Sequence, residues 1–361
     1  LLLVAFSPTV VAHSSIATLD VGIALFIVLG MWCIYEGRAS DTSFLNLLGA
    51  AFFGCALIVK YTALFVFPYV IFLIIYSHWL FRRSLRQVLI ELVAGTVIIW
   101  FIFCASFGFS GLFESKAEVS DGFFVRASTW LLPSMGVDTL KGKFVQARAS
   151  KHNSFWFGKV RPVGAIFYLV VVPIKLLVGS LALIIWFLVR WVRGKETTSV
   201  SWLYTIVPAL FFWGPFCFNK NYCGVRHLIP VLSLFFVWLG SLGRLFDESG
   251  WQRRGLCALL ALNCLAVVQC FPHQMSYYNL IGHGLTDGPF VFGCFDTDYG
   301  QEDKIDEELD KLSDHPVYVC PSPTWQPRAG YIAVSCVALT HKTSYRWLNH
   351  FRPMKHLNNT W

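Results

Sequence analysis

The chain has few charged residues and lacks several common motifs. Only 14 % of its 361 residues are charged, whereas 56 % are hydrophobic, which fits a lipid environment and not water. The eleven cysteines contain no CxxC pair and no His–Cys spacing that would indicate zinc. No convincing internal repeat is present, which weakens the case for a transporter built of inverted halves. The opening segment 1–6 has no initiator Met, basic segment or cleavage site, so we expect a truncated N-terminus and not a signal peptide.

Long apolar runs dominate the first 271 residues. A bilayer core about 30 Å thick needs roughly 17 to 25 apolar residues per helix, and only helices or closed barrels satisfy the backbone in lipid. The predicted fold class is therefore a polytopic α-helical membrane protein with about eight full helices and one truncated helix. The expected spans are 1–12 (partial), 21–36, 43–59, 63–80, 88–109, 163–189, 200–218, 228–243 and 256–271.

The basic residues are divided unequally between the two sets of short loops. One set, at 37–42, 81–87, 190–199 and 244–255, carries ten cations: Arg38, Arg82, Arg83, Arg86, Arg190, Arg193, Lys195, Arg244, Arg253 and Arg254. The opposite set, at 13–20, 60–62 and 219–227, carries three: Lys60, Lys220 and Arg226. The positive-inside rule places the first set in the cytoplasm. This distribution explains the net charge of +8 without a nucleic-acid partner.

Two exported segments are large. The loop 110–162 mixes aromatic residues with cations, which favours a segment lying at the lipid headgroups. Residues 272–361 have ordinary polarity and turn signals, and we predict a small exported α/β domain there. Its expected elements are a helix over 301–312 and strands at 291–294, 317–320 and 331–339. The predicted domains are thus 1–271 in the membrane and 272–361 outside it.

The cysteines fall into two groups according to these spans. Cys33, Cys55, Cys104, Cys257 and Cys264 lie within apolar spans, where a cysteine is by default a small hydrophobic residue. The remaining six lie on or near the exported side, where disulfides can persist: Cys217, Cys223, Cys270, Cys294, Cys320 and Cys336. A bridge between Cys294 and Cys336 is one pairing that this group allows.

The first exported turn places an acid at the start of a helix. His13 and Asp20 bound the segment 13–20, and Asp20 stands directly before the apolar run 21–30. A carboxylate at this point can be an N-cap that accepts backbone N–H bonds and meets the helix dipole. It can also face an exported active site, with His13 opposite. The two interpretations are compatible, because an N-cap is a rigid mount.

Two lysines stand at informative positions in the apolar part of the chain. Lys60 follows the apolar run 45–59, where it is either a snorkelling interfacial lysine or a ligand. Lys175 lies inside the span 163–189, after Pro173, and an ionisable group at that depth is a functional candidate. Alternatively, the segment 163–173 lies in the interface and leaves Lys175 at the membrane rim.

Arg226 and His227 begin an apolar span on the exported side. The guanidinium fork of an arginine binds phosphate oxygens in a bidentate manner, so Arg226 suits a lipid phosphate. The alternative is an anchor for lipid headgroups. The residues alone leave both open.

Several segments together resemble one family. They are 7–20 (Ser-Pro through Leu19-Asp20), 59–63 (Val-Lys-Tyr-Thr-Ala), 152–158 (His-Asn-Ser-Phe-Trp-Phe-Gly), 168–175 (ending Pro173-Ile174-Lys175), 224–230 (Gly-Val-Arg-His-Leu-Ile-Pro), 276–279 (Ser-Tyr-Tyr-Asn) and 296–301 (Asp-Thr-Asp-Tyr-Gly-Gln). In this order and spacing they resemble the polyprenyl-phosphate-sugar-dependent glycosyltransferases, related to dolichyl-phosphate-mannose protein mannosyltransferases and to the lipid A aminoarabinose transferase. The resemblance covers nearly the whole chain.

The resemblance implies a membrane-embedded GT-C fold and an inverting transfer of a sugar. The donor would be a polyprenyl-phosphate sugar, and the acceptor a lipid, protein or glycan on the exported, periplasmic face of a bacterial inner membrane. Such chemistry needs a base for the acceptor hydroxyl and cations for the departing phosphate. The main catalytic carboxylate of the family would lie upstream of Leu1, so the chain as given is expected to be inactive alone.

The resemblance also implies roles for individual residues. Asp20 looks like the second acidic position of the family, which would position the acceptor or support the missing base. Lys60, Lys175 and Arg226 resemble basic positions that hold the lipid-linked phosphate. His13, His152 and His227 are further expected substrate-binding residues. Some relatives bind a divalent cation, but the carboxylates here are too sparse to assign one. The segment 298–301 (Asp-Tyr-Gly-Gln) replaces an Asp-Trp-Gly-Gln pattern, and we interpret it as a turn capping the following helix.

Two rival functions use the same features differently. A lipid-linked saccharide transporter or flippase would also place cations near a headgroup cavity, but it predicts repeat symmetry. A noncatalytic scaffold would depend more on the exported domain than on the cavity. An acidic residue early in the first exported loop of the upstream sequence would favour the enzyme.

Overall fold

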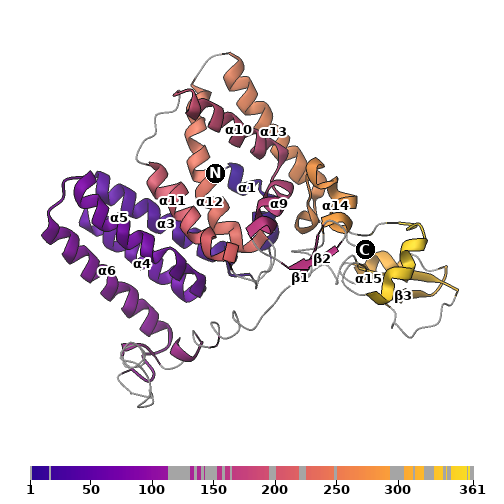
Figure 1. Ribbon diagram of the computed structural model, residues 1–361, viewed down its shortest axis with the longest axis horizontal. Coiled ribbons are helices and arrows are strands. Elements are labelled where there is room, and N and C mark those ends of the chain that lie inside the picture. Colours follow the sequence, from indigo (N-terminus) through magenta and orange to yellow (C-terminus); the bar gives the residue numbers. More distant parts are fainter. Residues whose placement is uncertain are drawn as a thin grey trace.

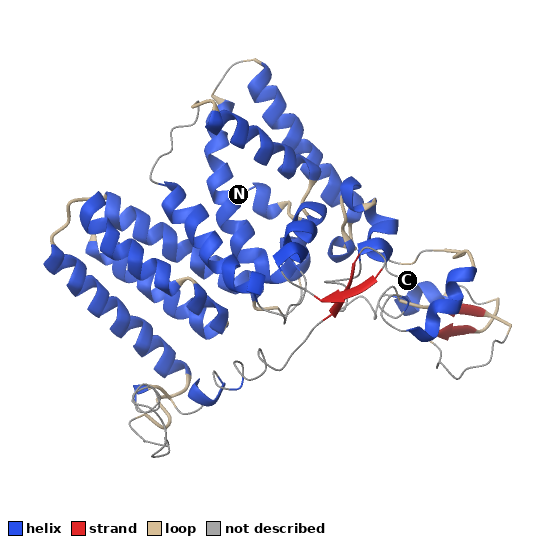
Figure 2. Ribbon diagram, viewed as in Figure 1, coloured by secondary structure: helices blue, strands red, loops and turns tan. Residues whose placement is uncertain are grey.

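The computed structural model consists almost entirely of helices, with two small two-stranded sheets (Figures 1 and 2). The residues that it describes are 2–15, 18–112, 131–133, 136–139, 142, 153–156, 159–162, 165–194, 201–218, 225–247, 250–292, 305–311, 314–320, 329–335, 339, 343–355 and 357. The Asp298 to Gln301 segment, His152 and the two cysteines of the suggested Cys294–Cys336 bridge lie outside them.

The first half of the helical domain is a packed group of long apolar helices. After the short α1 (Leu2–Ala5) and α2 (Pro8–Ser14) come α3 (Asp20–Ala39), α4 (Ser43–Val59), the 3₁₀ turn η1 (Tyr61–Phe65), α5 (Phe67–Leu80) and α6 (Leu85–Ser106). The helix α4 packs against both α3 and α6, and α5 packs against α6 (Figure 1). A capping box between Ser84 and Gln87 begins α6, as expected for a polar pair that precedes an apolar run.

The second half continues with α9 (Ala165–Lys175), α10 (Val178–Val192), α11 (Ser201–Phe218), η2 (Val225–Leu228), α12 (Ile229–Leu239), η3 (Gly240–Phe246) and α13 (Trp251–Cys270). The helix α12 lies between α11 and α3, so it joins the two halves. A large hydrophobic core runs through both, with Ile23, Phe53, Phe167, Phe212 and Leu232 among its buried residues.

The described helices fit the expected membrane spans. Four of them are long and apolar enough to cross a bilayer, namely α3, α6, α13 and the continuous run Val225–Phe246. The bent pair α9 and α10 would make a fifth span, and three shorter apolar helices cover Ser43–Val59, Phe67–Ser77 and Ser201–Cys217. Many large apolar side chains, such as Ile90, Val93 and Phe101 of α6, face outward. The predicted class, a polytopic helical membrane protein, is confirmed.

The predicted span 163–189 is not one continuous helix. The chain breaks between α9 and α10, and the two helices meet at a bend of 111°. Asn279 supplies the hydrogen bonds that the interrupted helix lacks: its Nδ2 donates to the carbonyls of Pro173 and Leu176, and its backbone N–H donates to the carbonyl of Ile174. A partner 100 residues away in sequence therefore stabilises the break, which apolarity alone did not reveal.

The segments after α13 are short. The turns η4 (Gln274–Ser276) and η5 (Leu280–Gly282) lead into α14 (Gly284–Phe292), and α15 (Ile305–Asp310), β3 (Val317–Val319), β4 (Tyr331–Ala333) and η7 (Thr343–His350) follow. The strands β3 and β4 form a parallel pair. They lie within the predicted strands 317–320 and 331–339, but the second prediction is too long, since β4 ends at Ala333 and Leu339 is helical. The strand predicted over 291–294 is wrong at its first two residues, which end α14, because Phe292 packs against Ile174 and Tyr278 and a short apolar run fits either element.

In the predicted interfacial loop, a second small sheet is described. The strands β1 (Asn153–Trp156) and β2 (Lys159–Pro162) pair antiparallel, with Asn153 opposite Pro162. Farther along the chain, α15 lies within the helix predicted over 301–312, and its Ile305 and Leu309 are buried with Leu357 in a small separate cluster. The boundary proposed near residue 271 stays a prediction.

Candidate active site

Three of the predicted site residues meet at one end of the helical domain. Lys60 Nζ donates a hydrogen bond to Asp20 Oδ1 and also lies 3.0 Å from His227 Nδ1. His227 Nδ1 is 3.5 Å from the same carboxylate oxygen. The Asp20 side chain is only 5 % exposed, whereas Lys60 is 21 % and His227 16 % exposed. An acid, an ammonium and an imidazole thus form a cluster that is partly open.

The cluster is assembled from the ends of three helical segments. Asp20 is the first residue of α3, Lys60 follows the last residue of α4, and His227 lies in the 3₁₀ turn that precedes α12. The expected N-cap role of Asp20 is corrected, since Leu19 occupies the N-cap position and no side-chain cap bond is formed. The Asp20 carboxylate is engaged by Lys60 instead, while its place in the first turn still suits the helix dipole.

Lys60 reaches Asp20 because the chain changes conformation at that residue. Lys60 has an extended backbone (φ −158°, ψ 125°) between the α-helix α4 and the 3₁₀ turn η1. The side chain can therefore turn across the end of α4 toward α3, against which α4 packs along its length. Asp20, Lys60 and His227 belong to the segments 13–20, 60–62 and 219–227, which carry few basic residues and which the sequence predicts to be exported.

The Asp20 carboxylate keeps hydrogen-bonding capacity for a ligand. Its two recorded contacts, to Lys60 and to His227, both involve Oδ1. Within the part of the chain that the structure describes, Oδ2 accepts no hydrogen bond. An ionised carboxylate can accept about four hydrogen bonds. Asp20 can therefore act as an acceptor or as a base toward a hydroxyl group that enters the cluster.

The other predicted site residues occupy separate positions. His13 is 1 % exposed in α2, where its carbonyl accepts a bond from Thr18 Oγ1. Lys175, 3 % exposed, ends α9; its Nζ donates to the carbonyl of Met275 at 3.0 Å and stands 4.2 Å from the centre of the Tyr278 ring. Arg226 is half-buried beside His227 in η2.

Both α2 and α9 pack against η2, so His13 and Lys175 belong to elements that adjoin the Asp20 cluster. The structure records no direct contact of either side chain with Asp20, Lys60 or His227 among the residues it describes. Of the residues expected to bind the substrates, Asp20, Lys60 and His227 contact one another, and the convergence of Asp20, Lys60, Lys175 and Arg226 on one headgroup stays a prediction.

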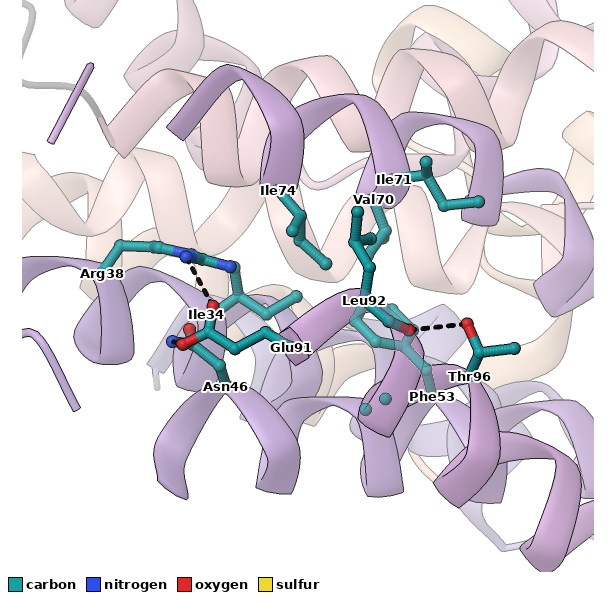
Figure 3. Close-up of a pocket in the computed structure, with 12 residues that line it drawn as sticks. Ile34, Arg38, Asn46, Phe53, Val70, Ile71, Ile74, Glu91, Leu92 and Thr96 are labelled. Atoms are coloured by element: carbon teal, nitrogen blue, oxygen red, sulfur yellow. Dashed lines mark hydrogen bonds and ion pairs between the residues drawn. The ribbon is translucent and has the colours of Figure 1, made fainter. Parts of the chain in front are cut away.

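A second polar cluster, which the sequence analysis did not single out, lies at the other end of α3 and α6. Glu91 of α6 forms ion pairs with Arg38 at 2.7 Å and with Arg83 at 2.8 Å, and it accepts hydrogen bonds from Ser43 and Asn46. Figure 3 shows Arg38 pointing at Glu91. Both residues line a cavity of about 50 Å³. The other lining residues include the apolar side chains Ile34, Phe53, Val70, Ile71, Ile74 and Leu92. Glu91 lies inside the predicted span 88–109, and an acid at that depth was the signal.

The described residues contain no group of three or more His, Cys, Asp or Glu side chains placed to hold a metal ion. The Asp20 cluster includes one carboxylate, one imidazole and an ammonium that competes with a cation for the same oxygen. Its donor set suits an anionic or hydroxyl ligand better than a divalent cation.

Comparison with known proteins finds a similarity in the first third of the chain. Residues 1–113 match the family model of dolichyl-phosphate-mannose-protein mannosyltransferases. We call residues 1–113 the mannosyltransferase-like segment, because they are similar to this family. The match contains Asp20 and Lys60, and together with the apolar helices it confirms the resemblance to a membrane glycosyltransferase. No curated protein and no solved structure matches the chain.

The mannosyltransferase-like segment ends shortly after α6, so His227, Arg226 and Lys175 lie beyond it. The contacts of Lys60 and Asp20 with His227 connect the matched segment to the second half of the helical domain. The candidate site is therefore formed jointly by the matched and unmatched parts of the chain.

Proposed function

We propose that this protein transfers a sugar, with inversion, from a polyprenyl-phosphate carrier to an acceptor on the exported face of the membrane. The single observation that carries the proposal is the Asp20–Lys60–His227 cluster. It lies at the end of the helical domain whose loops have few basic residues, and two of its members fall in the mannosyltransferase-like segment. A bacterial inner membrane, with the site facing the periplasm, is the expected location.

The roles in this proposal follow from charge and geometry. Oδ2 of Asp20, which accepts no hydrogen bond from the described residues, faces the acceptor and positions it or helps to deprotonate it. The cations Lys60 and Arg226 stabilise the negative charge that grows on the departing phosphate. Lys175, His13 and His152 complete the substrate-binding set that we propose. The match to a transferase family favours this function over the flippase alternative.

Substitution of the intact protein tests the site. Asp20→Asn and Arg226→Ala should each reduce sugar transfer about 10-fold or more, since removing a positioned acid–base group or charge costs catalysis. Glu36→Gln near the end of α3 and Arg253→Ala near the start of α13 are the matched controls, because they remove the same charges on the side that the sequence predicts to be cytoplasmic.

The assay is mass spectrometry of surface glycans and lipids in a deletion strain that expresses each variant at the wild-type level. A sugar that disappears in the deletion strain should return with both controls and not with the two site variants. Wild-type transfer by Asp20→Asn and Arg226→Ala would remove the site assignment. A deletion strain with an unchanged set of sugars would remove the function itself.

A further inference from the structure

The imidazole of His227 is held on one edge by the other two members of the cluster. Lys60 Nζ lies 3.0 Å from His227 Nδ1, a normal hydrogen-bond length, whereas Asp20 Oδ1 lies 3.5 Å away, beyond the usual range. An ammonium group can only donate a hydrogen bond. Nδ1 must therefore be the acceptor, which requires that it carries no proton.

The ring face of His227 is fixed as well. The Phe216 ring of α11 stacks on it with the centroids 5.5 Å apart and the planes 18° from parallel. Phe216 is itself buried and contacts Phe65 of η1 edge-on, so the stacking partner is part of the core. The imidazole can neither tilt nor flip without disturbing this aromatic contact or losing the bond from Lys60.

Only the Nε2 edge is left to meet a ligand. Nε2 makes no hydrogen bond to the described residues, and 16 % of the His227 side chain is exposed to solvent. A neutral imidazole whose Nδ1 accepts a bond carries its proton on Nε2.

We propose that His227 recognises a phosphoryl oxygen as an uncharged donor, with its proton fixed on Nε2 by the Lys60–Asp20 pair. The inference rests on the proposed function and gives His227 a defined task at the carrier phosphate. Arg226, the preceding residue, supplies positive charge at the same turn, while His227 supplies a directed hydrogen bond. His227 is thus a positioning residue for the phosphate.

The protonation state can be measured without any activity assay. The intact protein is labelled with ¹⁵N-histidine, reconstituted in lipid and studied by solid-state NMR near neutral pH, and the His227 signals are assigned by their loss in His227→Gln. We expect a neutral ring with the proton on Nε2. In Lys60→Met, a proton should appear on Nδ1, which then faces only the Asp20 oxygen. A wild-type proton on Nδ1, or on both nitrogens, overturns the inference.

Ligand binding tests the second half of the inference. The side-chain amide nitrogen of glutamine can occupy the place of Nε2, and that of asparagine the place of Nδ1. His227→Gln should bind a short-chain isoprenyl monophosphate within about 3-fold of wild type, whereas His227→Asn should lose about 10-fold to 100-fold, the value of one hydrogen bond to a charged group. The corresponding isoprenyl alcohol, which has no phosphate, should bind all three proteins alike.

Inorganic phosphate distinguishes the sources of this group. If inorganic phosphate binds more weakly than the isoprenyl monophosphate, and His227→Asn weakens both ligands more than His227→Gln does, the ligand is a lipid carrier. If the two phosphates bind equally well, the ligand is a free phosphate ion. If His227→Gln and His227→Asn weaken the binding of every phosphate ligand to the same extent, the inference is overturned. Its failure remains distinguishable from that of the proposed function, since neither the NMR nor the binding assay needs sugar transfer.

Discussion

The Glu91 cluster should control the stability of the helical domain. Glu91 is 5 % exposed, and its two ion-pair partners, Arg38 and Arg83, are 0 % and 3 % exposed. Glu91→Gln preserves the shape of the side chain but removes the negative charge that both guanidinium groups share. Breaking a buried ion pair from one side costs about 3 to 5 kcal/mol. In Glu91→Gln the Arg38 guanidinium is left buried without its ion-pair partner, whereas Arg83 keeps its ion pair with Asp41. We expect the free energy of unfolding to fall by about that amount.

The matched control is Glu36→Gln. Glu36 lies in α3 near Arg38, and its side chain makes no ion pair or hydrogen bond in the described part of the chain. Its replacement should change the free energy of unfolding by less than about 0.5 kcal/mol. Unfolding of the purified protein in mixed micelles, followed by the loss of helical circular dichroism as the denaturing detergent is raised, measures both variants under identical conditions.

A triple variant distinguishes a charge effect from a packing effect. Arg38→Met, Arg83→Met and Glu91→Leu together remove both buried positive charges along with the acid, so the desolvation cost disappears with the attraction. The triple variant should be more stable than Glu91→Gln alone. If Glu91→Gln unfolds like wild type and like Glu36→Gln, the ion cluster does not hold these helices together and the reasoning is refuted.

Three further predictions use the same unfolding assay. Asn279→Ala removes both Nδ2 bonds at the break between α9 and α10 and should cost about 2 to 3 kcal/mol; no loss would mean that water replaces them. Gly179→Ala should cost about 1 to 3 kcal/mol because its Cβ would lie 2.5 Å from the carbonyl of Leu259, whereas Gly214→Ala, with nothing within 4 Å, should be neutral or stabilising. Burial raises the pKa of Tyr277, so the unfolded state releases that proton first and stability should fall as pH rises above about 10, less steeply in Tyr277→Phe.

The sequence was sufficient to predict the helices that position the site. Apolar runs of the right length predicted α3, α4, α6, α11 and α13 because lipid leaves the backbone few alternatives to a helix. Alternation of the loops placed residues 13–20, 60–62 and 219–227 on one side, and the meeting of Asp20, Lys60 and His227 agrees with that arrangement. The small strands β3 and β4 were also predictable from β-branched and aromatic residues.

The contacts made by individual side chains were not predictable. The break after Lys175 depends on Asn279, which approaches it only in three dimensions, and the sequence around Pro173 fits a continuous span equally well. The last turn of α14 was mistaken for a strand, since four apolar residues have no decisive period. The sequence shows Glu91 as an acid within an apolar span, but it does not show the partners of that acid. These partners come from α3, α4 and the loop before α6, and no local sequence pattern connects them.

Asp20 at the start of α3 and Glu91 of α6, which pairs with Arg38 near the other end of α3, differ in how the protein engages their carboxylates. Both oxygens of Glu91 are engaged by the protein: Oε1 accepts hydrogen bonds from Arg83, Ser43 and Asn46, and Oε2 forms the ion pair with Arg38. Asp20 directs one oxygen at Lys60 and His227, and its other oxygen accepts no bond among the described residues. Both acids are almost fully buried, so burial alone does not distinguish them. The two acids differ in whether the protein engages both carboxylate oxygens: it does so at Glu91, whereas Oδ2 of Asp20 accepts no bond from the described residues, which is why Asp20 and not Glu91 enters the proposed substrate site.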